Sequence, residues 1–186
     1  MSRLRVATLP SVARWVRDGG VVAYPTEAVY GLGCDPLCEA AVLRILALKQ
    51  RPVEKGLILL AGSVEQLLPF IDVSTAEQAR MAARWPGPVS WVVPASARVP
   101  AWVRGAHTTV AVRVSGHPLA RELALAAGTP LVSTSANLAG QPSLRDADSV
   151  LQQLGDGLDA VLGGECDSTA KPSTIVDLHT GAVLRS

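Results

Sequence analysis

The sequence lacks any long hydrophobic run, which argues against a membrane-spanning protein. Its apolar stretches, such as residues 57–61, are about five residues long, whereas a helix needs roughly 18–20 apolar residues to cross a bilayer. Residues 1–10 hold two arginines but no apolar stretch long enough for the core of a signal peptide. We therefore predict a soluble protein located in the cytoplasm, with no membrane partner.

Cysteine is also scarce, which argues against a disulfide framework or a zinc site. The three cysteines, Cys34, Cys38 and Cys166, are few and odd in number, so reduced thiols are expected. Cys34 and Cys38 have the spacing of zinc ligands, but a structural site needs four ligands, and only Cys166 and scattered histidines remain. We predict no metal ligands among the side chains, and we assign no chemistry to the three histidines: His107, His117 and His179.

Several sequence motifs of known enzyme classes are missing. There is no Gly-Lys pair, hence no Walker P-loop, and Gly31-Leu32-Gly33 continues to Pro36 where a dinucleotide-binding fingerprint needs glycine. The patterns His-Glu-x-x-His and Gly-x-Ser-x-Gly are absent as well. Zincins, α/β-hydrolases and these two nucleotide-binding folds therefore have no local support.

The composition that is present is typical of one compact domain. The chain has 186 residues, of which 48% are hydrophobic and 18% charged, and its mean hydropathy is +0.28. A domain usually has roughly 100–200 residues, and this composition is too apolar for a disordered chain. We therefore predict a single domain over residues 1–186.

The pattern of apolar residues, caps and breakers predicts an α/β fold. Helices are predicted over residues 9–18, 39–50, 117–127 and 146–154, and two more are opened by Ser63 with Gln66 and by Ser74 with Glu77. Strands are predicted over residues 21–24, 57–61, 89–93, 109–114 and 131–135, with a hairpin at 174–178 and 182–185. Residues 25–36, rich in Gly and Pro, are predicted as a loop. Together these predict one twisted, open, mixed parallel and antiparallel sheet with flanking helices.

Four polar segments follow predicted elements, at places where open α/β sheets usually hold ligands. They are residues 24–33, 49–55, 133–137 and 172–177, with Pro86-Gly87-Pro88 and residues 110–114 between them. In this order the six motifs resemble those of the YrdC family, the threonylcarbamoyl-AMP synthases, over residues 21–185. The resemblance implies a YrdC-like fold. It also implies the short form of the family, in which residues 1–186 are a single catalytic domain.

The resemblance also implies a reaction and partners. The implied substrates are ATP, L-threonine and bicarbonate, and the products are threonylcarbamoyl-AMP and diphosphate. This nucleotidyl transfer is the first step towards threonylcarbamoyladenosine, the modified base next to the anticodon of some tRNAs. The implied protein partners are the tRNA threonylcarbamoyltransferase proteins that act next, and a weak contact with tRNA is a further expectation.

Positive charge is concentrated around residues 49–55, although the whole chain has a net charge of only +1. Two of the three lysines, Lys49 and Lys55, lie here beside Arg51. Attack on an α-phosphate needs positioned cations and Mg²⁺. We predict that these three side chains bind ATP, with Lys49 and Arg51 as catalytic groups, and that Mg²⁺ is held through phosphates and water. The alternative is a solvated helix end that complements the helix dipole.

Further polar side chains are candidates for the same site. The guanidinium of Arg113, mid-strand between valines, suits a carboxylate or carbamate. The hydroxyl of Thr26 can bind a small carboxylate or amino group, or simply cap the next turn. The resemblance assigns threonine binding to Thr26, Arg113, Ser133 and Ser173, and it assigns the remaining ATP contacts to Thr109, Ser135, Asn137, Ser143 and Arg185.

Two other functions are compatible with these residues. The first is a non-catalytic module of the same fold that binds RNA or nucleotides, although a net charge of +1 and 4% aromatic residues are unlike a dedicated RNA binder. The second is a hydrolase of carbamoyl-adenylates, which the sequence leaves open.

Overall fold

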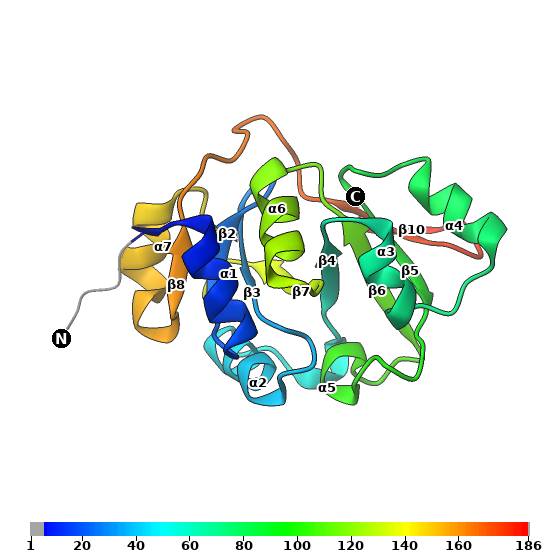
Figure 1. The fold of residues 1–186 in the computed structure, drawn as a ribbon, viewed down its shortest axis with the longest axis horizontal. Coiled ribbons are helices and arrows are strands. Elements are labelled where there is room, and N and C mark those ends of the chain that lie inside the picture. The colour runs from blue at the N-terminus through cyan, green and yellow to red at the C-terminus, as the bar shows by residue number, and fades with distance from the viewer. Residues whose placement is uncertain (1–5, 186) are drawn as a thin grey trace.

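Residues 6–185, the part of the chain that the computed structural model describes, form ten β-strands and seven α-helices (Figure 1). The strands are β1 (Val6–Ala7), β2 (Val22–Pro25), β3 (Tyr30–Gly33), β4 (Ile58–Ala61), β5 (Val89–Pro94), β6 (Thr109–Val114), β7 (Leu131–Ser135), β8 (Ala160–Leu162), β9 (Thr174–Asp177) and β10 (Val183–Arg185). The helices are α1 (Leu9–Arg17), α2 (Glu39–Leu48), α3 (Val64–Leu67), α4 (Thr75–Ala82), α5 (Ala101–Arg104), α6 (Pro118–Ala127) and α7 (Ala147–Leu154).

The ten strands form one sheet in the order β1-β8-β2-β3-β7-β4-β6-β5-β9-β10. Strand β4 runs parallel to β6, and β5 runs parallel to β9. Strands β2 and β3, and likewise β5 and β6, are antiparallel. The predicted hairpin is present as β9 and β10. The predicted fold class, a mixed sheet with flanking helices, is therefore confirmed.

Helices α1 and α6 pack against one face of the sheet and lie side by side in Figure 1. Their apolar residues, among them Val16 and Leu123, are buried in one cluster with Tyr24 of β2 and Leu60 of β4. Burying one such aliphatic side chain contributes about 1.5–3 kcal/mol. Helix α6 ends at Gly128, whose φ of 75° is the left-handed conformation that glycine adopts without strain.

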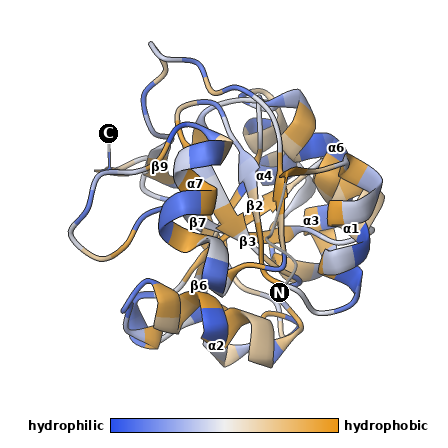
Figure 2. Cartoon of the chain, turned by 90° about the vertical axis from the view of Figure 1, so that its left-hand side faces the viewer, coloured by the Kyte–Doolittle hydropathy of each residue, from blue (hydrophilic) through white to orange (hydrophobic). Residues whose placement is uncertain are grey.

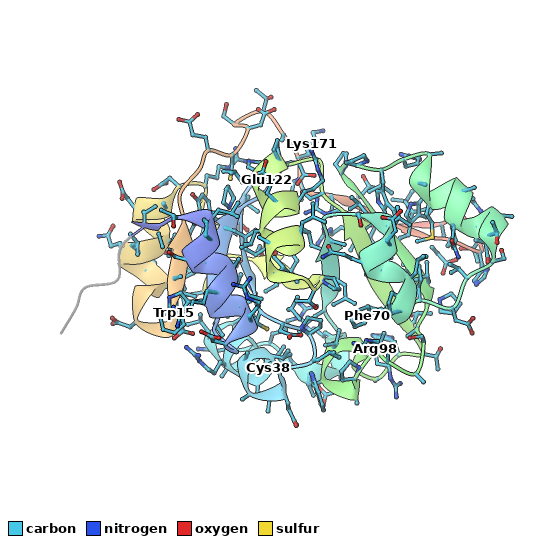
Figure 3. The ribbon with its side chains drawn as sticks, in the orientation of Figure 1. Trp15, Cys38, Phe70, Arg98, Glu122 and Lys171 are labelled. Atoms are coloured by element: carbon cyan, nitrogen blue, oxygen red, sulfur yellow. The ribbon has the colours of Figure 1, made fainter. Side chains whose placement is uncertain are left out.

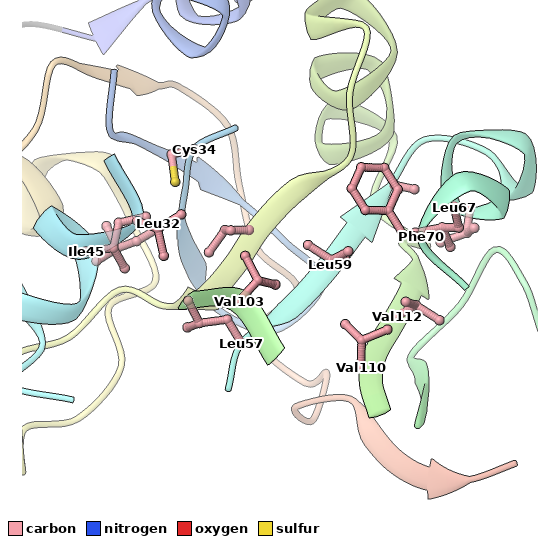
Figure 4. Close-up of a cluster of buried hydrophobic side chains, with 14 of the residues drawn as sticks. Leu32, Cys34, Ile45, Leu57, Leu59, Leu67, Phe70, Val103, Val110 and Val112 are labelled. Carbon is pink, nitrogen blue, oxygen red and sulfur yellow. The ribbon is translucent and has the colours of Figure 1, made fainter. Parts of the chain in front are cut away.

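The opposite face packs against α2, α5 and α7 in a second, larger cluster. Figure 4 shows part of it: Ile45 of α2 lies beside Leu32 of β3, and Val103 of α5 lies beside Leu57. Leu59 of β4 and Val112 of β6 continue the cluster towards Phe70. In Figure 2 the strands at the centre are mostly hydrophobic, whereas the helices alternate between hydrophobic and hydrophilic colours. This alternation is the pattern of helices with one face on a core.

One face of the sheet is only partly covered by helices, and its uncovered part is the open face of the sheet. Leu59 and Val112 point into the larger core cluster, so their neighbours Ile58 and Ala111 point to the other side of the sheet. Leu60, on that same side, is covered by α6. At Ile58 and Ala111 the same side lines a cleft instead. The sheet therefore carries a helix layer and a binding surface on one face.

The prediction of a loop over residues 25–36 is wrong, because β3 lies within it. The two glycines of β3 lower its strand propensity, yet β3 pairs with β2 on one side and β7 on the other. A Cβ atom on Gly33 would lie 2.4 Å from the carbonyl oxygen of Val132. Glycine is therefore needed there for the close approach of two strands, and the sequence signal for a turn was misread.

The seven predicted strands are also fewer than the ten that residues 6–185 form. No sequence pattern indicated β1 or β8, which have two and three residues, or the four-residue helix α5. Ser74 and Glu77 form the predicted capping box. Ser63 makes no side-chain cap, and Gln66 instead accepts a hydrogen bond from Gly62 N at 2.9 Å. Within residues 6–185, no helix is long and apolar enough to cross a bilayer.

Candidate active site

A cleft of about 970 Å³ lies on the open face of the sheet, over β7, β4, β6, β5 and β9. The structure brings together every side chain that the sequence nominated. The residues concerned are Thr26, Lys49, Arg51, Lys55, Thr109, Arg113, Ser133, Ser135, Asn137, Ser143, Ser173 and Arg185. Their division into ATP and threonine contacts stays a prediction.

The cleft concentrates positive charge. Among the described residues that line it, seven are cationic and two acidic, a net charge of +5 with histidine counted as neutral. The whole chain carries only +1. The cationic residues are Lys49, Arg51, Lys55, Arg104, Arg113, Lys171 and Arg185, and the acidic ones are Glu27 and Asp177. Such a surface attracts anionic ligands and focuses their approach.

Lys49 lies at the C-terminal end of α2 and reaches across to the segment after β7. Its ammonium donates hydrogen bonds to Ser135 O at 2.6 Å, Asn137 O at 3.2 Å and Asn137 Oδ1 at 2.8 Å. Burial, and then the nearby charge of Arg51, lower the pKa of Lys49 from 10.5 to about 8. The alternative of a solvated helix end is therefore wrong for Lys49, because its ammonium holds Ser135 and Asn137 in the segment that lines the cleft.

Arg51 follows Lys49 after a sharp turn at Gln50, whose φ is 48°. Its Nε and Nη2 donate to Gly56 O at 3.3 and 2.9 Å, and Nη1 has no hydrogen-bond partner within residues 6–185. Arg51 also lines the cleft. Burial lowers the pKa of this guanidinium below its ordinary value. Lys55 is exposed in the short 3₁₀ turn Val53–Lys55, and within residues 6–185 it makes no ion pair or side-chain hydrogen bond.

The segment after β7 is held by its own polar side chains. Ser135 Oγ donates to Asn137 Oδ1 at 2.7 Å, and Asn137 Nδ2 donates to Leu138 O and Gln141 O at 3.0 and 2.9 Å. Ser133 lies two residues earlier on β7, on the same face of the strand as Ser135. Ser133, Ser135 and Asn137 therefore all line the cleft.

Strand β6 supplies Thr109 and Arg113 from the same face. Arg113 is 7% exposed, and its Nη1 lies 3.2 Å from Glu27 Oε2. Thr26, beside Glu27 in the chain, is also buried, and its Oγ1 donates to Val29 O at 2.6 Å. Thr26 therefore closes a turn and caps no helix.

The C-terminal hairpin completes the cleft. Arg185 on β10 donates from Nη2 to Ser173 O at 2.9 Å and to Ser173 Oγ at 3.2 Å. Loss of water around the guanidinium, and then the charges of Arg113 and Arg51, lower the pKa of Arg185. The guanidiniums of three distant segments therefore share one space, where an anion relieves their mutual repulsion.

Sequence reasoning did not nominate four charged residues that line the cleft: Glu27, Arg104, Lys171 and Asp177. The sequence offers no local signal for Glu27, because its partner Arg113 lies 86 positions away along the chain. Lys171, labelled in Figure 3, lies on the segment between β8 and β9 and lines the cleft. It is the one lysine outside residues 49–55 and stands directly before the motif Pro172-Ser173, a signal that was available.

None of the three cysteines is among the residues that line the cleft. Cys34 is buried in the core, and burial raises the pKa of its thiol. Cys38 and Cys166 are half-buried. Among residues 6–185, no three His, Cys, Asp or Glu side chains are grouped so that they could hold a metal ion.

An open sheet face with converging guanidiniums and a rim of hydroxyl and amide groups defines an α/β protein that binds small phosphates or carboxylates. The comparisons with known proteins agree. The family model Sua5_yciO_yrdC, described as "Telomere recombination", matches residues 14–186. This chain therefore belongs to the Sua5/YciO/YrdC family.

Relatives within and around this family are similar over most of the chain. A protein of Pseudomonas aeruginosa named threonylcarbamoyl-AMP synthase is 55% identical over 174 residues, covering 93% of this chain and 94% of the relative. The crystal structure of P. abyssi Sua5 complexed with L-threonine superposes with a TM-score of 0.89 at 36% identity, covering 95% of this chain and 53% of that one. The structure of E. coli YciO superposes with a TM-score of 0.85 at 28% identity, covering 96% and 88%.

Proposed function

We propose that this protein is a threonylcarbamoyl-AMP synthase. L-Threonine and bicarbonate combine to a carbamate with loss of water, and a carbamate oxygen attacks the α-phosphate of ATP. The bond from the α-phosphorus to the bridging oxygen breaks, and diphosphate leaves with its electron pair. The product, threonylcarbamoyl-AMP, is the activated precursor for the base next to the tRNA anticodon.

One observation carries this proposal: a single cleft gathers both predicted sets of residues, with a net charge of +5. A bimolecular displacement needs the nucleophile and the nucleotide in one space. The cleft receives residues from Thr26 to Arg185, which supports residues 1–186 as one catalytic domain. The relatives named threonylcarbamoyl-AMP synthase point to the same reaction.

The cations supply the chemistry that the transfer requires. Diphosphate develops negative charge as it leaves, and preorganised donors in a cleft stabilise that charge without reorganising. Arg51 offers Nη1 for this role, while its other donors hold Gly56 O. Lys49 already has three protein acceptors, so it contributes its charge and fixes Ser135 and Asn137. Lys55 and Arg185 add positive charge at the rim.

The threonine end of the cleft is proposed to lie at β6 and the turn after β2. Arg113 pairs with the carboxylate of threonine or of its carbamate through a two-pronged contact. Thr26 and Ser133 offer small polar groups beside it, and Ser173 is held in place by Arg185. Threonine is bound by a family relative, P. abyssi Sua5, in its crystal structure.

Mg²⁺ belongs to this proposal as a companion of ATP. The two carboxylates that line the cleft are already engaged: Glu27 by Arg113, and Asp177 by the backbone N–H groups of His179 and Thr180. These residues do not fit a carboxylate-built Mg²⁺ site. The metal is expected to arrive on the phosphates with its own waters.

The wider setting follows from the reaction. The product must pass to a tRNA threonylcarbamoyltransferase, and a weak tRNA contact at the cleft remains part of the proposal. A cytoplasmic location is proposed from the reduced thiols, and cell fractionation tests it. A purely RNA-binding module and a carbamoyl-adenylate hydrolase are not favoured, since the named relatives are synthases.

Omission of single substrates tests the function. The protein is incubated with ATP, Mg²⁺, L-threonine and bicarbonate, and diphosphate release is measured. We expect release to need both threonine and bicarbonate, because neither alone supplies the carbamate. Release that continues without bicarbonate would show an ordinary amino-acid adenylation or an ATPase, and the proposal would be wrong.

A further inference from the structure

Glu27 joins the end of β2 to the end of β6 through three hydrogen bonds. Its Oε2 accepts from Arg113 Nη1 at 3.2 Å and from Ser115 Oγ at 3.0 Å, and its Oε1 accepts from Gly116 N at 2.6 Å. The side chains of Glu27 and Arg113 are only 17% and 9% exposed. Charge-assisted hydrogen bonds of this kind are stronger than neutral ones.

This contact spans a large part of the sheet. Strands β3, β7 and β4 lie between β2 and β6, and four steps of about 4.8 Å would separate them by about 19 Å in a flat sheet. The twist of the sheet and the turn after β2 bring the carboxylate across that gap. Glu27 therefore links the turn after β2 to the end of β6, and it lines the cleft next to Thr26 in the chain.

The pairing leaves part of Arg113 available. Only Nη1 of Arg113 is hydrogen-bonded within residues 6–185, so Nη2 and Nε can donate to a ligand in the cleft. Arg51 and Arg185 line the same space, and without an acidic partner their charges would push the Arg113 guanidinium away. Glu27 is the acidic side chain that touches Arg113.

We propose that Glu27 is a positioning residue for the substrate carboxylate. It holds Arg113 in the one orientation in which the free edge of the guanidinium meets threonine or its carbamate. It does not touch the reacting atoms and acts through Arg113. This inference rests on the proposed function, since it names the residue that orients Arg113 at the threonine end of that site.

Glu27→Gln tests the role, because it keeps the size of the side chain and removes its charge. L-Threonine binding is measured by calorimetry with ATP present and bicarbonate omitted, so that no carbamate forms. We expect the Kd for threonine to rise about tenfold, somewhat less than loss of a direct charged contact would give. The Kd for ATP should stay within about threefold. Glu27→Asp, which keeps the charge, should recover part of the threonine affinity.

Ser115→Ala is the matched control. It removes a hydrogen bond to the same carboxylate oxygen and leaves the Glu27–Arg113 pair in place. A merely structural role for Glu27 would lower the melting temperature of both variants and weaken both ligands together. We expect Ser115→Ala to lower the melting temperature while threonine affinity stays within about twofold. Equal loss of threonine affinity in both variants would overturn the proposal.

A double-variant cycle shows whether Glu27 acts through Arg113. In an Arg113→Ala background, Glu27→Gln should change threonine affinity by less than about twofold, because the residue it positions is gone. Additive effects would overturn the assignment. If the unaltered protein binds no threonine, the proposed function fails and this inference with it. If it binds threonine and Glu27→Gln binds equally well, this inference alone fails.

Discussion

Two cavities meet at Glu27, Lys171 and Pro172, and they carry opposite charge. The substrate cleft has a net charge of +5 from its lining side chains. The second, which we call the rear cavity, has a volume of about 640 Å³. Among the described residues that line it, three are acidic and one is cationic, for a net charge of −2 with histidine counted as neutral: Glu27, Glu165, Asp167 and Lys171.

The difference shows that space alone does not make a site for ATP. Both cavities are roomy, but only the cleft gathers guanidiniums from several distant segments. The wall between them belongs to the segment from β8 to β9, which runs above α6 in Figure 1. Asp167 on this segment accepts hydrogen bonds from Thr169, which lower the pKa of its carboxyl and keep it ionised. Triphosphate should therefore be drawn to the cleft and repelled by the rear cavity.

The largest expected effect comes from Arg51→Ala in the cleft. This change removes a charged donor from the proposed diphosphate position, so ATP affinity and adenylate formation should each fall about ten- to a hundredfold. His117→Ala in the rear cavity is the matched control and should change both by less than about threefold. Calorimetry and turnover would check this. Equal losses in the two variants would erase the functional distinction between the cavities.

Lys49→Ala should combine a loss of ATP affinity with a loss of stability. A charge at the end of an exposed helix usually contributes less than about 0.5 kcal/mol to stability, and the sequence places Lys49 at the end of a predicted helix. The structure corrects this, since the ammonium is half-buried and holds Ser135 and Asn137. Leaving such acceptors without a donor costs about 1–3 kcal/mol. Urea unfolding measures this cost, and a variant as stable as the natural protein would contradict the bridging role.

The lowered pKa of Lys49, about 8, predicts a pH dependence of ATP binding. Above pH 8 the free protein loses this charge, and ATP, which favours the charged form, should bind up to about tenfold more weakly per pH unit. The folded pKa lies below the unfolded value of 10.5, so the unfolded chain holds more protons between these values. This group therefore makes unfolding less favourable as pH rises through that window.

Lys49→Arg is the control for the pH effect, because a guanidinium stays charged over the same range. Its ATP affinity should be nearly constant from pH 7 to about 9.5. The same slope in Lys49→Arg and in the natural protein would assign the titration to another group.

The smallest effect is expected from Cys166→Ser in the rear cavity. Burial raises the pKa of this thiol, so it stays protonated and weakly nucleophilic near neutral pH. Turnover should change by less than about twofold, and alkylation of Cys166 should be slow. A loss of turnover comparable to that of Arg51→Ala would show that the rear cavity takes part in the reaction.

The sequence predicted most elements of the fold. Every polar residue that it nominated lines the cleft in the structure. Long elements such as α2 and β6 carry a clear periodicity, and Gly128 marks the end of α6 unambiguously. Strand β3 was missed because its two glycines are typical of a turn. Glycine is needed at Gly33 because Val132 and Tyr24 leave no room for a Cβ atom at this position. No local pattern records the distance between two strands.

The long-range hydrogen bonds and the ion pair within the site could not be predicted from the sequence, because their partners are far apart along the chain. The bond from Lys49 to Ser135 crosses 86 positions, and the pair of Glu27 and Arg113 crosses the same separation. Residue types indicate that cations and hydroxyls are available, whereas the fold decides which of their donors are already used. The structure thus reassigns Lys49 to a shared structural and electrostatic role and adds Glu27 to the site.

The most direct test of the account uses isotope-labelled bicarbonate. The protein is incubated with ATP, Mg²⁺, L-threonine and ¹³C-bicarbonate, and the adenylate product is identified by mass spectrometry. We predict threonylcarbamoyl-AMP that carries the labelled carbon, formed by the natural protein and strongly reduced in Arg51→Ala. An unlabelled threonyl-adenylate, or a labelled product formed equally well by Arg51→Ala, would contradict the claim that this cationic cleft joins the threonine carbamate to ATP.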